Sequence, residues 1–210
     1  MKQFVKDSLF LLGKLFSYIY PYKFHTFLVR LRDSLHSGYI AHQFNRLPIN
    51  SLIRRPFYLR GGKYIRIGEN TTIQKNGVLT AWDKYHENHY NPQIIIGNHV
   101  DIGEYCHITA MNKIMIGNGV LTGRWVTITD NSHGKMDKFS FELPPSERII
   151  HSPGAVIIED NVWIGDKVTI LPNVRIGRNV VIGANSVVTK NIPKNSIAVG
   201  NPAKIVKVID

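Results

Sequence analysis

The chain reads IEDNVW IGDKVT ILPNVR IGRNVV IGANSV over residues 158–187, and this stretch decides the fold. An aliphatic residue opens each hexapeptide, and a second apolar or small residue follows four positions later. Neither the helical period of about 3.6 residues nor the strand period of about 2 gives a repeat of six. A coil with three flat sides does, because each side takes one short strand and one turn. Aliphatic side chains then stack one coil apart, at about the 4.8 Å strand spacing.

The same register recurs upstream in shorter blocks, with Gly often following the aliphatic residue. The blocks begin at Ile67, Ile96 and Ile116, and the last of them follows a two-residue slip. Gly and Asn at the corners tolerate turn conformations that branched residues do not. We therefore predict an all-β solenoid, a parallel β-helix of hexapeptide repeats over residues 61–210, rather than a sandwich of evenly spaced hairpins.

The positive charge is concentrated before the repeats. Residues 1–66 hold twelve Lys or Arg against Asp7 and Asp33, a net +10 of the +11 total, whereas residues 67–210 are nearly neutral. A basic segment rich in aromatic residues is typical of contact with a membrane surface or an anionic ligand, and equally of a solvated face. The single cysteine, Cys106, suits a reducing compartment and falls at an inward position of the repeat.

Residues 1–60 are predicted to form a basic helical segment. We expect two amphipathic helices over residues 3–20 and 23–45, interrupted at Pro21. Their apolar faces would cover the open end or flank of the solenoid, and the alternative is that they lie against a membrane. The apolar run from Leu9 to Tyr20 is shorter than the roughly 20 residues that a membrane span needs. We expect a cytoplasmic protein, with peripheral contact at the inner membrane as the alternative.

Departures from a monotonous scaffold are where function is expected. The loop excursions 81–93 and 134–153 interrupt the repeat. His133 closes a hexapeptide at the corner where the second excursion leaves, so it is both held and accessible, and a neutral imidazole suits general-base chemistry near neutral pH. The polar residues 130–132 could fix its tautomer. His86 and His89 have no further ligand at metal spacing, so we expect no metal.

Several blocks resemble a known family. Residues 160–165 (DNVWIG), 168–177 (VTILPNVRIG), 182–190 (IGANSVVTK) and 199–204 (VGNPAK) resemble the hexapeptide-repeat acyltransferases, in particular the maltose/galactoside and bacterial polysaccharide O-acetyltransferases. The resemblance implies a left-handed β-helix, a homotrimer with active sites between subunits, and acetyl-CoA in the groove between neighbouring subunits. It also implies that His133 is the general base.

The resemblance assigns further residues. The residues implied in binding acetyl-CoA are Trp163, Asp166, Ala184, Thr189, Lys190, Lys204 and Lys207. His107 and Tyr105 are implied in binding the acceptor, with His107 at a position where relatives carry Asn. The lysines suit the phosphates of a polyanionic donor.

The sequence therefore predicts acetyl-CoA-dependent O-acetylation of a saccharide hydroxyl by direct transfer, with no protein nucleophile. The helical motif that supplies acceptor contacts in the simple-sugar enzymes is not recognisable in residues 1–60, and both excursions differ from theirs. A larger acceptor, such as a saccharide unit of capsule or lipopolysaccharide, is expected. The alternatives are an amino-sugar N-acetyltransferase and a catalytically silent trimeric scaffold. No nucleic-acid partner is expected.

Overall fold

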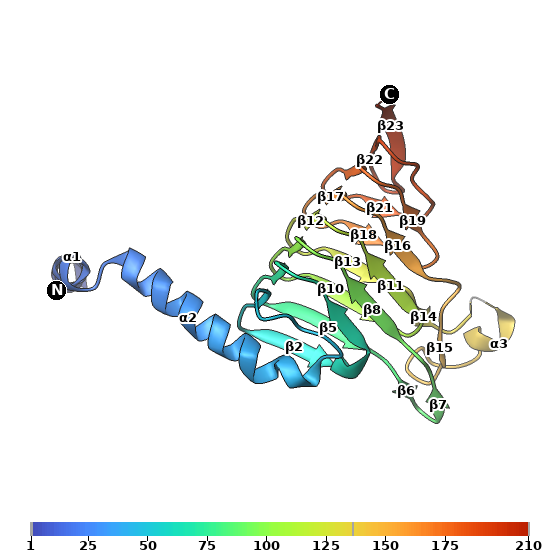
Figure 1. The fold of residues 1–210 in the computed structure, drawn as a ribbon, viewed down its shortest axis with the longest axis horizontal. Helices are drawn as coiled ribbons and strands as arrows, with labels where there is room; N and C mark the ends of the chain where they lie inside the picture. The colour runs from blue at the N-terminus through green and yellow to red at the C-terminus, as the bar shows by residue number, and fades with distance from the viewer. Residues whose placement is uncertain (1, 136, 210) are drawn as a thin grey trace.

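The computed structural model describes residues 2–135 and 137–209, and within them the chain forms three parallel sheets beside two long N-terminal helices (Figure 1). The sheets are numbered I, II and III in the order in which each coil meets them. Sheet I contains β3 (Ile65–Ile67), β8 (Gln93–Ile96), β11 (Lys113–Ile116), β16 (Val156–Ile158) and β19 (Arg175–Ile176). Sheet II contains β1 (Leu52–Ile53), β4 (Thr72–Ile73), β9 (Asp101–Ile102), β12 (Leu121–Thr122), β17 (Trp163–Ile164), β20 (Val181–Ile182), β22 (Ser196–Val199) and the antiparallel β23 (Lys204–Val208). Sheet III contains β2 (Phe57–Arg60), β5 (Gly77–Ala81), β10 (His107–Ala110), β13 (Thr127–Thr129), β18 (Thr169–Ile170) and β21 (Val187–Val188).

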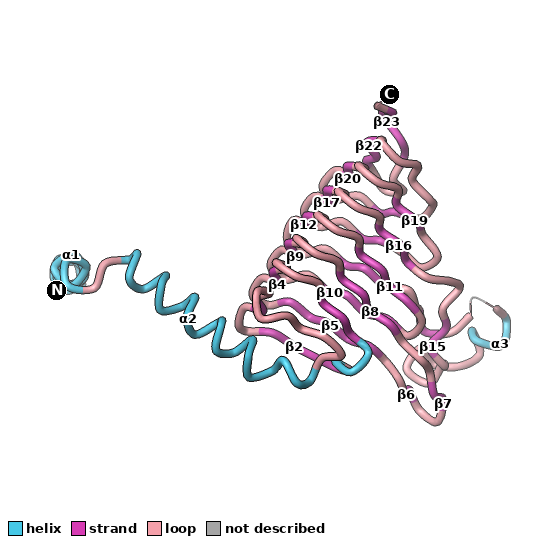
Figure 2. Tube along the Cα trace, viewed as in Figure 1, coloured by secondary structure: helices cyan, strands magenta, loops and turns pink. Residues whose placement is uncertain are grey.

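Successive strands of the chain fall in sheets I, II and III in rotation, so the backbone winds as a three-sided coil (Figure 2). The hexapeptide positions stack as predicted, because Ile158 pairs with Ile176 in sheet I and Ile164 with Ile182 in sheet II. These four side chains are at most 1% exposed. The aliphatic positions of the repeat therefore form the core, which runs along the axis of the coil.

The corners between strands depend on Asn in the left-handed backbone conformation. The Asn residues with φ between 54° and 61° are Asn70, Asn76, Asn161, Asn173, Asn179, Asn185 and Asn195. Asn adopts this conformation more readily than most other residues with a side chain. Tyr105 and Trp125 take the same conformation at the corners between sheets II and III, where bulky residues are uncommon.

The sheets begin before residue 61, where the repeats placed the boundary. β1 pairs with β4 and β2 pairs with β5, both in parallel, so residues 52–60 already belong to the coil. This coil was missed because residues 46–60 lack the Ile-Gly hexapeptide signature that marks the later coils. The basic helical segment therefore ends earlier than predicted.

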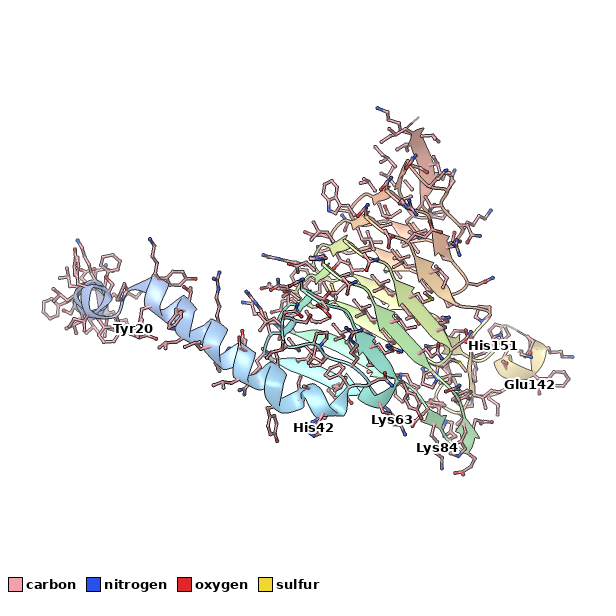
Figure 3. The ribbon with its side chains drawn as sticks, in the orientation of Figure 1. Tyr20, His42, Lys63, Lys84, Glu142 and His151 are labelled. Atoms are coloured by element: carbon pink, nitrogen blue, oxygen red, sulfur yellow. The ribbon has the colours of Figure 1, made fainter. Side chains whose placement is uncertain are left out.

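The N-terminal helices are α1 (Lys2–Ile19) and α2 (Tyr22–Ile40), separated near Pro21 as expected, and the short 3-10 helix η1 (Ala41–Gln43) follows. A second 3-10 helix, η2 (Gly62–Tyr64), leads into β3. The expectation that the apolar faces of the long helices cover the solenoid is wrong. α1 buries no side chain (Figure 3).

α2 docks on the first coil through Asp33, Ser37 and Ile40, which are its buried residues. Ser37 Oγ accepts a hydrogen bond of 2.8 Å from the Ile53 N–H at the start of sheet II. Ile53 lies in β1, the edge strand of sheet II, whose outward backbone groups have no neighbouring strand within the described residues to pair with. A polar side chain can satisfy such a group by a hydrogen bond, whereas an apolar side chain cannot. None of the helices in the described part of the chain is long and apolar enough to cross a bilayer.

Both excursions contain short antiparallel pairs. Excursion 81–93 forms a hairpin of β6 (Lys84–Tyr85) and β7 (Asn88–His89). The second excursion leaves through β14 (Ser132–His133), includes the helix α3 (Lys138–Phe141), and returns through β15 (Ile150–His151). Both lie on the side of the coil opposite α1, where Lys84, Glu142 and His151 are labelled in Figure 3.

Candidate active site

His133 lies on β14, immediately after the turn that leaves sheet III. Asp130 in this turn is fully buried. Its two carboxylate oxygens accept hydrogen bonds from the backbone N–H groups of Met111 (2.9 Å) and Asn112 (2.8 Å), and the Asn131 side chain donates to the first of them at 2.9 Å. A buried carboxylate with these partners fixes the backbone that carries His133.

The His133 ring contacts Tyr85 of the other excursion. Tyr85 Oη lies 3.5 Å from His133 Nδ1, and the two rings meet edge to face with centroids 5.6 Å apart. The same hydroxyl donates its proton to the Ser146 carbonyl oxygen at 3.0 Å. A phenol has one proton, so toward His133 it can only accept. This arrangement favours the tautomer with a proton on Nδ1, which leaves Nε2 of His133 free to accept one.

Sequence reasoning assigned this tautomer-fixing role to residues 130–132, and the structure gives it to Tyr85. The side-chain hydrogen bonds of Asp130, Asn131 and Ser132 go to backbone groups and to one another. These residues hold the turn, and Tyr85 contacts the ring.

His133 faces a cleft of about 360 Å³ between the two excursions and the outer face of sheet III. Its lining includes Tyr58, Trp82, Tyr85, His107 and Asn131. A larger cavity of about 490 Å³ lies between α2 and residues 47–52, but its lining residues carry no titratable side chain. The His133 cleft brings two imidazoles, two phenols and an amide together on a partly apolar wall, which suits chemistry on a bound acceptor.

Trp82 forms a fixed aromatic wall of this cleft. Its indole N–H donates to Thr109 Oγ1 at 3.2 Å, and the Arg60 guanidinium carbon lies 3.7 Å from the ring centroid. The hydrogen bond and the cation–π contact hold the ring orientation. A rigid aromatic surface beside several hydrogen-bonding groups suits a ring-shaped, polyhydroxylated acceptor.

His107 lines the same cleft as His133. It lies on β10 between Val78 of β5 and Thr127 of β13, and its side chain is half-buried. Burial lowers the pKa of this imidazole below its usual value, which favours the neutral ring. A neutral imidazole offers both a donor and an acceptor, and the amide of an Asn also offers both kinds of group.

Tyr105, Asp166 and Ala184 lie on a different edge, at the corners between sheets II and III. Asp166 Oδ1 accepts a 2.8 Å hydrogen bond from the Arg124 N–H of the preceding coil. Tyr105 stacks on Trp125 with centroids 4.9 Å apart, and neither residue lines the His133 cleft. Of the two residues predicted to bind the acceptor, His107 lines the cleft, whereas Tyr105, two positions earlier in the chain, lies at the corner outside it.

The remaining residues predicted to bind the donor are exposed at three places. Trp163 lies on β17 of sheet II, with its side chain 55% exposed. Thr189 and Lys190 follow β21 at the end of sheet III. Lys204 and Lys207 lie on β23, at the edge of sheet II.

One chain does not bring His133 together with Asp166. His133 follows the carboxyl ends of the sheet III strands, whereas Asp166 precedes their amino ends. Trp125 lies before the sheet III strand β13 and Asp130 lies after it, and extended chain between these two residues is about 16 Å long. The candidate base and the candidate donor-binding edge are therefore at opposite edges of the same sheet.

The comparisons with known proteins agree with the geometry. Residues 155–190 match the family described as bacterial transferase hexapeptide (six repeats). WbbJ of Escherichia coli (strain K12), by name a lipopolysaccharide biosynthesis O-acetyl transferase, is 39% identical over 160 residues, covering 74% of this chain and 78% of WbbJ. The polysialic acid O-acetyltransferase of E. coli O1:K1 is 37% identical over 145 residues, which cover 69% of this chain and 43% of that enzyme.

Among solved structures, the hexapeptide-repeat acetyltransferase VCA0836 of Vibrio cholerae O1 biovar eltor, in complex with acetyl coenzyme A, has a TM-score of 0.56 and 26% identity over 90% of both chains. AntD, an N-acyltransferase of Bacillus cereus, has a TM-score of 0.68 at 22% identity, over 83% of this chain and 88% of AntD, and so shares the fold.

These matches define the class, that of enzymes that transfer acyl groups on a hexapeptide-repeat scaffold. The chain belongs to the hexapeptide-repeat acetyltransferases. The predicted family and the prediction of an acyltransferase are both confirmed.

Sequence reasoning did not identify Tyr85, Trp82 or Arg60 as parts of the site. Tyr85 and Trp82 belong to excursion 81–93, which the sequence marks only as an interruption of the repeat. Tyr85 and His133 are 48 positions apart, and no periodicity relates two excursions that leave different coils. The available signal was that both excursions leave sheet III at the same corner, after β5 and after β13, with only the β10 coil between them.

Proposed function

We propose that the chain is an acetyl-CoA-dependent O-acetyltransferase that acetylates a hydroxyl group of a saccharide. The observation that carries the proposal is His133, held by Tyr85 with Nε2 free, in a cleft with an aromatic wall. The relative that is 39% identical over most of its length is named as an O-acetyl transferase of lipopolysaccharide biosynthesis, which supports a saccharide hydroxyl as the acceptor.

In the proposed reaction, acetyl-CoA supplies an acetyl group activated as a thioester. His133 Nε2 takes the proton of the acceptor hydroxyl as the hydroxyl oxygen bonds to the acetyl carbon and the carbon–sulfur bond breaks. The proton then passes to the departing thiolate, so the imidazole returns to its starting form. His107 and Asn131 are in reach of the acceptor within the same cleft, and their neutral polar groups can orient it without competing for the proton.

We further infer that the enzyme is a homotrimer of left-handed coils, as the family resemblance implies, with each active site between two subunits. The separation of His133 from Asp166 supports this, because a neighbouring copy has to present its Trp163 and Asp166 edge to the His133 of this one. Lys204 and Lys207 are exposed and basic, which fits them to the phosphates of the donor. Light scattering should give three times the 23.9 kDa of one chain.

The deciding experiment is a screen of thiol release from acetyl-CoA over candidate glycans, with wild type and His133→Ala side by side. We expect transfer onto a saccharide hydroxyl, reduced about 100-fold or more by the substitution, with CoA binding retained. An amino sugar as the preferred acceptor would replace the O-acetyl assignment by N-acetyl transfer. A His133→Ala variant within a few-fold of wild type would remove the general-base assignment.

A further inference from the structure

The helix α1 has an apolar face that none of the residues described by the structure covers. At about 100° per residue, its large apolar side chains gather on about half of the circumference. They include Phe4, Leu9, Leu11, Leu12, Leu15 and Phe16, which are between 58% and 76% exposed. Lys2, Lys6 and Lys14 lie on the other half. A soluble domain rarely exposes so continuous an apolar surface unless the surface binds something.

α2 presents a second apolar face, directed away from the solenoid. The stripe consists of Phe24, Phe27, Leu28, Leu31, Leu35 and Tyr39, spaced by three and four residues and between 39% and 76% exposed. The opposite side of α2 carries the buried residues Asp33 and Ser37, and Ser37 accepts a hydrogen bond from β1. The apolar stripe is therefore on the side of α2 that faces solvent, although the polar side is the one that is buried.

The charges around these faces are almost all positive. In α1 and α2, Lys2, Lys6, Lys14, Lys23, Arg30 and Arg32 are opposed by Asp7 and Asp33 alone. Asp33 is buried and pairs with its neighbour Arg32 at 3.1 Å. A second copy of the arm, packed against this one, would bring like charges together, whereas an anionic surface neutralises them.

We propose that α1, together with the outer stripe of α2, is a site that binds the enzyme to an anionic lipid surface. α1 lies in the plane of the interface, with its apolar half inserted below the headgroups and its lysines among the lipid phosphates. α2 is fixed to the first coil through Ser37 and so ties the solenoid to the surface. Neither acetyl transfer nor the acceptor enters this argument.

The test is co-sedimentation of the full chain with vesicles of phosphatidylcholine, alone or mixed with phosphatidylglycerol, at low and at high salt. We expect binding to the mixed vesicles at low salt, weakened by high salt, and much weaker binding to phosphatidylcholine alone. Each basic residue at an anionic surface contributes about fivefold to affinity, the equivalent of about 1 kcal/mol. Lys6→Gln with Lys14→Gln should therefore weaken binding about 30-fold.

The matched control is Arg178→Gln with Lys194→Gln, which removes the same charge from exposed positions late in the solenoid and should leave binding unchanged. Leu12→Ser with Phe16→Ser keeps every charge and should weaken binding about 100-fold or more. Since α1 buries no side chain, both α1 variants should retain wild-type unfolding temperature and oligomeric state.

Three results would overturn the proposal: no binding to the mixed vesicles at low salt, equal weakening by the control pair, or α1 variants that change the oligomeric state without changing vesicle binding. The last result would identify the covering partner of α1 as a second copy of the chain. The readout is lipid binding, so a failure of the acetyltransferase assignment would leave it unaffected.

Discussion

Removing the Tyr85 hydroxyl tests whether this residue positions the base. Tyr85→Phe keeps the ring against His133 and deletes the acceptor that lies 3.5 Å from Nδ1. A hydrogen bond of ordinary length has a net worth of about 0.5–1.5 kcal/mol. At 3.5 Å the lower half of this range applies, so kcat should fall about two- to fivefold. The Michaelis constant for acetyl-CoA should not change, because Trp163 and Asp166, the residues proposed to bind the donor, do not line the cleft that contains Tyr85.

The matched control is Tyr90→Phe, which deletes a phenol from the same excursion. Tyr90 Oη donates to the Ile150 carbonyl oxygen at 3.4 Å and makes no contact with the His133 ring. Steady-state kinetics with a saturating acceptor should show wild-type kcat for this variant. A similar loss in both variants would mean that the excursions had loosened, and the specific role of Tyr85 would be lost.

The decisive measurement is the double variant. If Tyr85 acts only through His133, adding Tyr85→Phe to His133→Ala should change kcat by less than twofold, since the group that it positions is already gone. Full additivity of the two losses would refute the positioning role and assign Tyr85 a direct contact with the acceptor instead.

Three further results are expected. The pKa of His107 is lower in the folded chain than its unfolded value of about 6.5, so the unfolded chain binds the proton more readily and the wild type loses stability as the pH falls below 6.5. His107→Asn should flatten this part of the curve of unfolding temperature against pH, and an unaltered slope would contradict the prediction. Mixed oligomers of inactive His133→Ala and inactive Trp163→Ala chains should regain activity, because some sites then combine an intact base with an intact donor edge; mixtures that stay inactive would argue for a site within one chain. Lys204→Ala with Lys207→Ala should raise the Michaelis constant for acetyl-CoA more than it lowers kcat, and the reverse pattern would remove their role in binding the donor.

The coil could be predicted because its signal is local and repeated. Ile158, Ile164 and Ile170 occupy the same position in successive hexapeptides, and each stacks on its counterpart one coil later. The first coil escaped prediction because strands β1 and β2 are held by pairing with the next coil, without the Ile-Gly signature of their own.

The predictions that proved wrong concern contacts between segments, such as which side of α2 packs against the coil. An amphipathic pattern shows that α2 has an apolar side, but it does not show whether the protein itself covers that side. Docking is decided by the hydrogen bond that the Ile53 N–H donates to Ser37 Oγ, a contact across 16 positions. The Tyr85 contact with His133 likewise depends on how two excursions fold over each other, which no pattern within either excursion specifies.

The three-sided coil also sets fixed spacings along its axis. The backbone leaves sheet III for sheet I at the same corner in every coil, so an arm inserted one coil later would move its histidine by one strand spacing, about 4.8 Å, in the same direction. The distance between a reactive group and the first coil can then change only in steps of that size. Relatives with acceptors of different length could be obtained by moving an insertion from one coil to the next, with no change to the core.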